Sequence, residues 1–295
     1  MKVVTIFGFN NQKKILDNYF KSEYPSGSFL FHGQEMIGKK TLALELANKH
    51  ITRSGGSATH DLLFIDSSHS DSGQTISIDK IREAKKFLSL SPFGGKLKFV
   101  IIDNAHEMQE EAQNSILKII EEPPSYAIMI LISHKTDTIL PTILSRCQKF
   151  YFPAHSPQVI SKILNDNNTG LSEEQIKFVS DFSNGRTGMV FNILKENSFK
   201  DIKKAVQKLS DLISSDIHER FLFVANIVDK SKAGELEKTI LYWMLYLRPK
   251  LTQDNDGKSK ADVVRMAKNL LKLHYTISNP HYNKRLAMEN FVLTL

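Results

Sequence analysis

The feature that most constrains the fold of this chain is a set of short apolar runs that alternate with helix-like segments in its first half. KLKFVIID (96–103) and AIMILIS (127–133) are apolar along nearly their whole length, and shorter runs occupy 28–33, 61–66 and 148–152. Strands without a polar face are typical of a parallel sheet that helices cover on both sides. The sequence therefore predicts an α/β domain with a parallel sheet.

The segments between these runs have the apolar spacing of helices, and we predict helices at 41–50, 77–90, 107–122 and 140–146. The third of these ends at Pro123-Pro124, since proline cannot continue a helix.

After Pro153 the pattern changes to almost purely helical. We therefore predict three domains: an α/β domain at 1–155, a small helical lid at 156–197 and an all-α domain at 198–295. In the last, GELEKTILYWMLYL is apolar over most of its circumference and is expected to be a central helix.

The stretch GQEMIGKKT, which begins at Gly33, has the spacing of a phosphate-binding loop, G-x-x-x-x-G-K-[ST]. In such loops backbone N–H groups cradle phosphates, the lysine reaches the outer ones and the hydroxyl ligates Mg²⁺. Gly33, Gly38 and Lys39 fit the first two roles. Lys40 stands where the hydroxyl belongs, and Thr41 comes one position late. The motif predicts an altered P-loop that lacks its usual metal ligand.

FVIIDNAHEM resembles the Walker B strand of AAA+ ATPases, in which an aspartate at the strand end holds Mg²⁺ and the next residue, a glutamate, polarises the attacking water. Asp103 is present, but Asn104 replaces the glutamate, and a neutral amide cannot accept a proton at ordinary pH. Two elements of the same reaction are altered, which favours loss of hydrolysis.

Four segments occur in a fixed order: ATHDLLFID, SPFGGKLKFVIIDNAHEM, AQNSILKIIEEPP and ILPTILSRCQKFYF. Together they resemble the bacterial DNA polymerase III clamp loader, and most closely its delta-prime subunit family. The resemblance covers most of 5–195 and returns at NKRLAMENFVL (283–293). It implies an AAA+ core, a helical lid and an all-α C-terminal collar domain that closes a ring of subunits.

Arg146, in the tripeptide SRC, follows a short helix that begins at a proline. A guanidinium at the end of an element can be presented to a neighbouring subunit, and it is suited to phosphate because it is planar and always charged. The resemblance implies that Arg146 is an arginine finger acting in trans. The alternative from the residues alone is an arginine paired with a local carboxylate.

Three departures from the family concern cofactors. ITRSGGSATH (51–60) replaces the usual four-cysteine module, so no zinc or other metal is expected. Met189 stands where the second sensor usually has an arginine, and Arg186 is displaced from that position. Ser133 or His134 stands near the first sensor, and the sequence leaves its role open. We expect ATP binding to be weak or absent.

Composition excludes several classes of protein. The single cysteine, Cys147, rules out an internal disulfide, and the N-terminal MKVVTIFGFN is unlike a signal peptide. No apolar stretch is long enough to span a membrane, so a cytoplasmic protein is expected. The net charge of +7 is spread along the chain and gives no evidence of direct DNA binding.

The resemblance therefore implies a non-hydrolysing clamp-loader subunit that braces the ring and gives Arg146 to a neighbouring ATPase. Its expected partners are the delta and gamma/tau subunits, with the sliding clamp and primed DNA reached through the complex. Alone it is expected to have no ATPase activity, although it would be part of a polymerase holoenzyme. The alternative is an active motor subunit, in which Thr41 ligates Mg²⁺.

Overall fold

A computed structural model describes the chain except for residues 1–7, 24, 54, 56–57, 68–74, 94, 168, 197, 231–233, 253–256 and 280. It divides into two compact units. The first unit comprises Met1–His155 and Arg186–Gly188, and the second comprises Ser156–Gly185 and Met189–Leu295. The predicted lid-to-collar boundary at 197/198 falls inside the second unit, and the division into three domains stays a prediction.

A five-stranded sheet in the order β2-β3-β4-β1-β5 forms the centre of the first unit, and all neighbouring strands are parallel. The strands are β1 (Gly27–Gly33), β2 (Leu62–Ile65), β3 (Lys98–Ile102), β4 (Ala127–Ser133) and β5 (Gln148–Phe152). Every strand coincides with a predicted run to within two residues at each end. The predicted parallel α/β core is confirmed.

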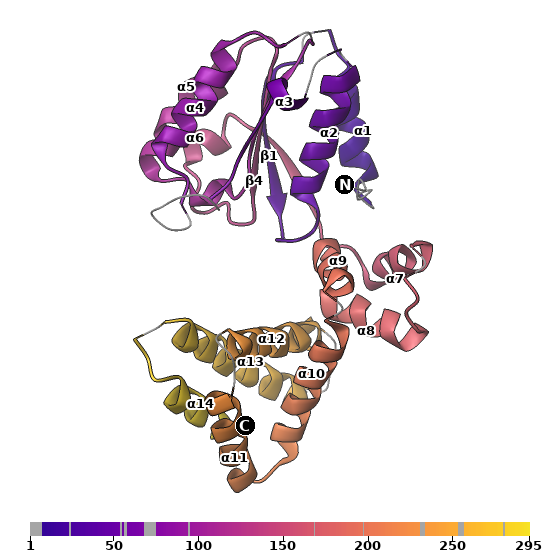
Figure 1. Cartoon of the computed structure of the whole chain (residues 1–295), viewed down its shortest axis with the longest axis vertical. Coiled ribbons are helices and arrows are strands. Elements are labelled where there is room, and N and C mark those ends of the chain that lie inside the picture. Colours follow the sequence, from indigo (N-terminus) through magenta and orange to yellow (C-terminus); the bar gives the residue numbers. More distant parts are fainter. Residues whose placement is uncertain are drawn as a thin grey trace. The chain divides into compact units, whose positions relative to one another are not determined.

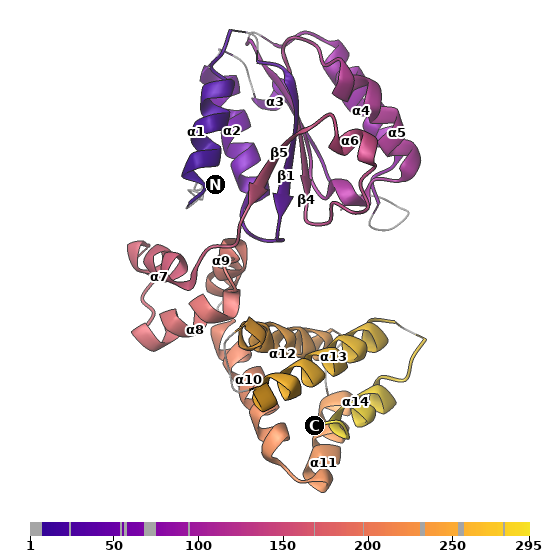
Figure 2. The ribbon, with the colours of Figure 1, turned by 180° about the vertical axis from the view of Figure 1, so that it is seen from behind.

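Helices cover both faces of this sheet (Figure 1). On one face lie α1 (Asn10–Tyr19) and α2 (Lys39–Arg53), and on the other lie α4 (Ile78–Ser89), α5 (Glu110–Glu121) and α6 (Pro141–Leu144), as the reverse view also shows (Figure 2). Successive strand residues face opposite sides: Phe29 and Phe31 join the α1–α2 core, and Leu30 joins the α4–α6 core. Two separate cores explain why the strands carry no polar face.

Three short elements differ from the predictions. The sequence analysis predicted no helix for α1 or for the single turn α3 (Ala58–Asp61). The helix predicted from residue 107 begins at Glu110, and a 3₁₀ turn, η1 (Ala105–Glu107), precedes it. Met108 and Gln109 have non-helical ψ angles of 129° and 151°, and they separate this turn from α5, so the α-helix begins only at Glu110.

The described part of the second unit is helical throughout. Its helices are α7 (Pro157–Asp166), α8 (Glu173–Ser183), α9 (Thr187–Lys195), α10 (Phe199–Ser214), α11 (Ile217–Lys230), α12 (Glu235–Thr252), α13 (Gly257–Ser278) and α14 (Lys284–Val292). The first two residues of α9 belong to the first unit. A core of α/β type followed by helical segments is the predicted fold class, and it is confirmed. Among the described residues, no helix is both long and apolar enough to cross a bilayer.

Helix α12 is the central helix of this unit, as the apolar stretch predicts. It packs against α8, α10 and α13. Trp243 on α12 is fully buried, stacks on Phe291 and donates a hydrogen bond from Nε1 to the Ala205 carbonyl oxygen at 2.7 Å. The indole therefore joins three helices, α10, α12 and α14.

Candidate nucleotide-binding site

The predicted P-loop forms a glycine-dependent turn at the end of β1. Gly33 (φ 141°) and Gly38 (φ 103°) occupy backbone conformations that favour glycine, and Met36 between them is also left-handed at φ 59°. A Cβ at Gly33 would lie 2.2 Å from the carbonyl oxygen of Phe152, so close packing also requires a glycine there. The loop leads directly into the N-terminus of α2, as in P-loop proteins.

Lys39, the predicted phosphate-binding lysine, is folded back onto its own loop. Its ammonium donates hydrogen bonds to the carbonyl oxygens of Gly33 at 2.8 Å and Gln34 at 2.5 Å. The residue is only 6% exposed, and burial lowers the pKa of the ammonium to about 8. Lys39 is therefore at the loop, but its hydrogen-bonding capacity is already partly used by the protein.

Lys40 forms an ion pair with Asp103, the predicted Walker B aspartate. Its Nζ lies 3.3 Å from Oδ2 of Asp103 and 4.3 Å from the centre of the Phe64 ring. The other carboxylate oxygen of Asp103, Oδ1, accepts a hydrogen bond from the backbone N–H of Asn104 at 3.1 Å. Both oxygens of the carboxylate thus have a partner from the chain itself.

A pocket of about 230 Å³ lies at this end of the sheet. Its lining contains the predicted residues Gly38, Lys39, Thr41 and Asp103 together with Lys40, Asn104, Ser133, His134, Glu35, Met36, Ile132 and Gly188. The structure therefore brings the predicted P-loop and Walker B residues to one place. Of the predicted nucleotide-binding set, Gly33 alone is not in the lining, because it ends β1 beneath the loop.

The first-sensor position carries a buried polar cluster. Ser133 is 1% exposed, donates from Oγ to the Lys135 carbonyl oxygen at 2.6 Å and lies 3.3 Å from Nδ1 of His106. The rings of His106 and His134 are 4.1 Å apart, and burial lowers the pKa of both. The Ser133 hydroxyl is thus held within the chain, and the imidazole of His134 faces the pocket in neutral form near pH 7.

Residues 186–188 pack directly against the P-loop, which the sequence did not predict. The Gly188 N–H donates a hydrogen bond to the Met36 carbonyl oxygen at 2.6 Å. The Thr187 hydroxyl donates one to the Ile37 carbonyl oxygen at 3.0 Å. A Cβ at Gly188 would meet the Met36 oxygen at 2.8 Å, so this approach needs glycine. Met189, at the predicted second-sensor position, belongs to the second unit.

Arg146 lies outside this pocket, between α6 and β5. Its Nε is 2.5 Å from Oε1 of Glu121, and its Nη1 donates to the Thr142 carbonyl oxygen at 3.1 Å. A local carboxylate partner, the alternative that the sequence left open, is therefore present. The side chain of Arg146 is nevertheless 39% exposed, so the ion pair does not hide the guanidinium from a partner molecule.

The sheet register separates Arg146 from the P-loop of the same chain. Arg146 precedes β5, whose first residue pairs with Phe29, whereas the P-loop follows the last residue of β1, Gly33. Four residues along a parallel strand correspond to roughly 13 Å. Arg146 and the pocket therefore lie toward opposite ends of the sheet.

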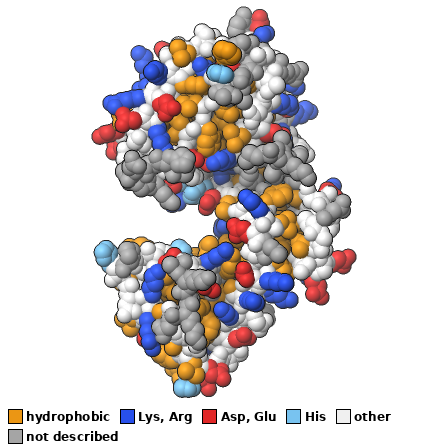
Figure 3. Space-filling model, viewed as in Figure 1, with side chains coloured by type: hydrophobic (Ala, Val, Ile, Leu, Met, Phe, Trp, Pro, Cys, Tyr) orange, Lys and Arg blue, Asp and Glu red, His pale blue; other side chains and the backbone are white. Residues whose placement is uncertain are grey.

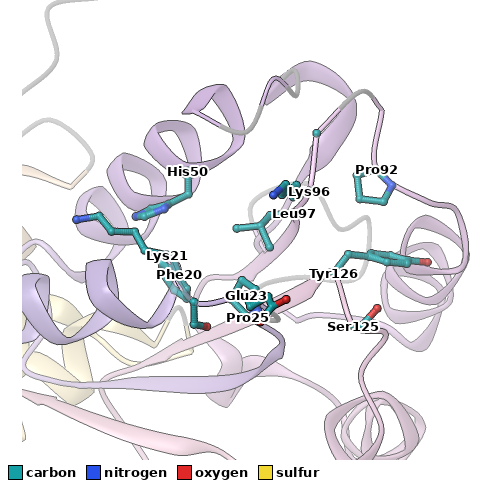
Figure 4. A pocket seen from close by; sticks show the side chains of 12 residues that line it. Phe20, Lys21, Glu23, Pro25, His50, Pro92, Lys96, Leu97, Ser125 and Tyr126 are labelled. Carbon is teal, nitrogen blue, oxygen red and sulfur yellow. The ribbon is translucent and has the colours of Figure 1, made fainter.

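A second pocket in the first unit, of about 680 Å³, lies at the amino ends of the strands (Figure 4). Phe20, Leu97 and Tyr126 contribute apolar surface to it, and Lys21 and Lys96 contribute positive charge. No sequence motif pointed to it, because its lining comes from isolated residues before several different strands. It lies away from the P-loop residues.

The fold defines the class: a parallel α/β domain of AAA+ type followed by helical segments. The sequence family described as "DNA polymerase III, delta subunit" matches residues 8–156, about half of the chain. The chain belongs to this family, and its predicted resemblance to clamp-loader subunits of DNA polymerase III is confirmed.

Individual relatives agree with this assignment. The chain is 26% identical over 222 residues to DNA polymerase III subunit delta' of Bacillus subtilis, covering 72% of this chain and 67% of that protein. It is 26% identical over 255 residues to subunit gamma/tau of Mycoplasma genitalium, covering 79% of this chain but only 40% of that protein. A gamma subunit-related protein from Thermotoga maritima has the same fold, with a TM-score of 0.60, 20% identity and 96% of each chain covered.

Proposed function

We propose that this chain is a non-hydrolysing subunit of a DNA polymerase III clamp loader, and that Arg146 acts as an arginine finger for the ATP site of a neighbouring subunit. The helical second unit carries the collar that braces the ring. Partners are the delta and gamma/tau subunits, with the sliding clamp and primed DNA reached through the complex. The protein works in the cytoplasm.

The observation that carries the absence of hydrolysis is the ion pair between Lys40 and Asp103. A lysine ammonium occupies the side of Asp103 at which an ATPase holds its Mg²⁺. Asn104 stands at the position where an ATPase needs a general base, and here it adopts a left-handed backbone conformation that starts a turn. An active motor subunit would need Thr41 to ligate the metal beside Asp103, but Lys40 already pairs with that carboxylate.

The position of Arg146 supports a role in trans. Its guanidinium is partly exposed and lies toward the opposite end of the sheet from the chain's own P-loop. A fixed guanidinium stabilises the charge that spreads over the phosphoryl oxygens in the transition state, without reorganisation. Glu121 holds this guanidinium in place until a phosphate competes for it.

We do not assign direct DNA binding to this chain. Basic and acidic side chains are intermixed over the visible face of each unit and do not form one basic stripe (Figure 3). Strong nucleic-acid binding requires clustered Lys and Arg.

The test is Arg146→Ala in a loader reconstituted with the ATPase and delta subunits. An arginine finger contributes roughly 10³–10⁵-fold at one ATP site. The loss over the whole complex is smaller, because the other ATP sites keep their own fingers. Clamp loading and DNA-stimulated ATPase should fall while assembly persists, since an exposed ion pair contributes at most about 1 kcal/mol to stability. Arg146→Lys should rescue only partly, because an ammonium cannot make the bidentate contact.

Arg82→Ala is the matched control, since Arg82 also lies in the first unit, is exposed and pairs with a carboxylate, Asp79, at 2.7 Å. It should leave loading unchanged. Wild-type loading by the Arg146→Ala complex would overturn the finger, and turnover near 1 s⁻¹ by the isolated wild-type chain would overturn the non-hydrolysing assignment.

A further inference from the structure

The P-loop pocket has a cation of its own. A P-loop ATPase places a divalent cation between the hydroxyl after its lysine, the Walker B aspartate and the phosphates. Here the residue in the hydroxyl position is Lys40, and its Nζ reaches Oδ2 of Asp103 at 3.3 Å. Sequence position and contact therefore place one positive charge where the metal would lie.

The residues at this point do not fit Mg²⁺. That ion requires oxygen ligands in near-octahedral geometry at 2.0–2.1 Å. Lys40 supplies no oxygen, and its ammonium repels a second cation beside Asp103. The remaining oxygen of Asp103 accepts the N–H of Asn104. A divalent ion would have to displace Lys40 from Asp103, and the ammonium would then also lose its contact with the Phe64 ring.

Lys40 does fit the electrostatic part of the metal's role. An ammonium is a compact charge with three donors, so it can hold Asp103 through one and a phosphate oxygen through another. It lines the pocket together with Lys39 and the N-terminus of α2. Its side chain is 46% exposed, so its remaining donors are accessible to a ligand.

We propose that Lys40 replaces the divalent cation, so that this pocket binds a diphosphate group without metal. This rests on the proposed idle state of the chain's own site. The pocket, about 230 Å³, is smaller than the ~300–1,000 Å³ of ordinary small-molecule sites. Its positive charges come from Lys39 and Lys40, so the ligand is recognised by its diphosphate group.

The experiment is calorimetry of the full chain with pyrophosphate, ATP and adenosine, each in EDTA and in excess Mg²⁺. Pyrophosphate and ATP should bind in EDTA with similar affinity, and adenosine should not bind. Excess Mg²⁺ should weaken the binding of both pyrophosphate and ATP, since it neutralises the ligand charge that Lys40 and Lys39 recognise. If ATP binds while pyrophosphate does not, the base is the recognised group and the proposal fails.

Two substitutions test the role of Lys40. Lys40→Thr restores the consensus loop, so metal-free affinity should fall about tenfold or more while Mg²⁺ now strengthens binding. Lys40→Met removes the charge without adding a hydroxyl, and it should weaken metal-free binding by a similar factor with no gain from Mg²⁺. Lys49→Met is the matched control, because Lys49 is on the same helix, 48% exposed, and pairs with Asp17 at 2.7 Å.

Lys49→Met should bind as the wild type does. The proposal is overturned if the wild type shows no diphosphate binding at millimolar concentration in EDTA, if Mg²⁺ strengthens its binding tenfold, or if Lys40→Met binds normally. Lys40→Met tests the role of the charge without Lys40→Thr. The proposal can therefore be overturned even if the Lys40→Thr chain does not fold. These outcomes are independent of the Arg146→Ala assay in the assembled loader.

Discussion

Asn104 illustrates, at the scale of single residues, that the residue after the predicted Walker B aspartate also has a backbone role. It holds φ 51° and ψ 47° at the junction between β3 and η1. Asparagine adopts this left-handed conformation more readily than other residues with a side chain, whereas glutamate does so at a cost. The amide therefore fits the turn as well as lacking basicity.

Restoring the general base should destabilise the protein without restoring activity. Asn104→Glu is expected to lower the free energy of unfolding by about 1–2 kcal/mol, since most L-residues are strained in this conformation. Hydrolysis should stay at background, because Lys40 still pairs with Asp103 and still lacks the hydroxyl that a P-loop ATPase uses to ligate Mg²⁺. Urea denaturation and a phosphate-release assay measure the two effects. Asn104→Gly is the control and should keep its stability; an Asn104→Glu chain as stable as wild type would contradict this account.

Gln113 shows how helix α5 is fixed at the scale of elements. Its side chain is 5% exposed and donates from Nε2 to the carbonyl oxygens of Met108 and Thr138, each at 3.1 Å. Its Oε1 accepts the N–H of Leu140 at 2.8 Å. One amide therefore connects α5 to the segment before it and to the loop between β4 and α6, which leads to Arg146.

Gln113→Leu should cost about 2–3 kcal/mol of unfolding free energy, because three backbone groups lose the partner that the buried Gln113 amide gives them, and the hydrogen bond to the Met108 carbonyl oxygen is fully buried. Chemical denaturation measures this cost. Gln12→Leu provides the comparison: Gln12 also donates to a backbone carbonyl, that of Tyr151 at 3.0 Å, but its hydrogen bond is exposed. That variant should lose less than about 1 kcal/mol. Equal losses in the two variants would show that burial is not what makes Gln113 important.

At the scale of the whole molecule, the second unit exposes several large apolar side chains whose burial against a partner would be favourable. Ile213 at the end of α10 and Ile217, Phe221 and Leu222 in the first half of α11 are 41%, 58%, 37% and 51% exposed. Grouped exposed apolar residues are characteristic of interaction sites. We therefore expect the α10–α11 turn to take part in the proposed ring.

The double variant Ile217→Asp, Leu222→Asp should fold normally, since both positions are exposed, yet co-elute poorly with the partner subunits in size-exclusion chromatography. Two charges at the interface would have to be desolvated without partners. Gln207→Glu adds one charge on exposed α10 without changing apolar surface and should assemble as the wild type does. Normal assembly of the double variant would exclude this turn from the ring contacts.

Most strands and helices of the first unit could be predicted from the sequence, because they depend on local patterns of apolar residues. Apolar runs gave the five strands, helical spacing gave α2, α4 and α5, and the P-loop glycines were recognisable by spacing. Helix α1 was missed because its ten residues include only Ile15 and Leu16 as aliphatic positions, too few for a periodic signal.

The sequence by itself determined that Lys40 and Asn104 stand where the P-loop and Walker B patterns carry a hydroxyl and a carboxylate, because this is a matter of residue type and spacing. Only the tertiary structure decided what the replacements do. A parallel sheet brings the carboxyl ends of β1 and β3 to the same edge, and this places Lys40 against Asp103. Packing of α5 beside α6 likewise decided that Glu121 holds Arg146, since contacts between distant segments depend on register and packing, which leave no local pattern in the sequence.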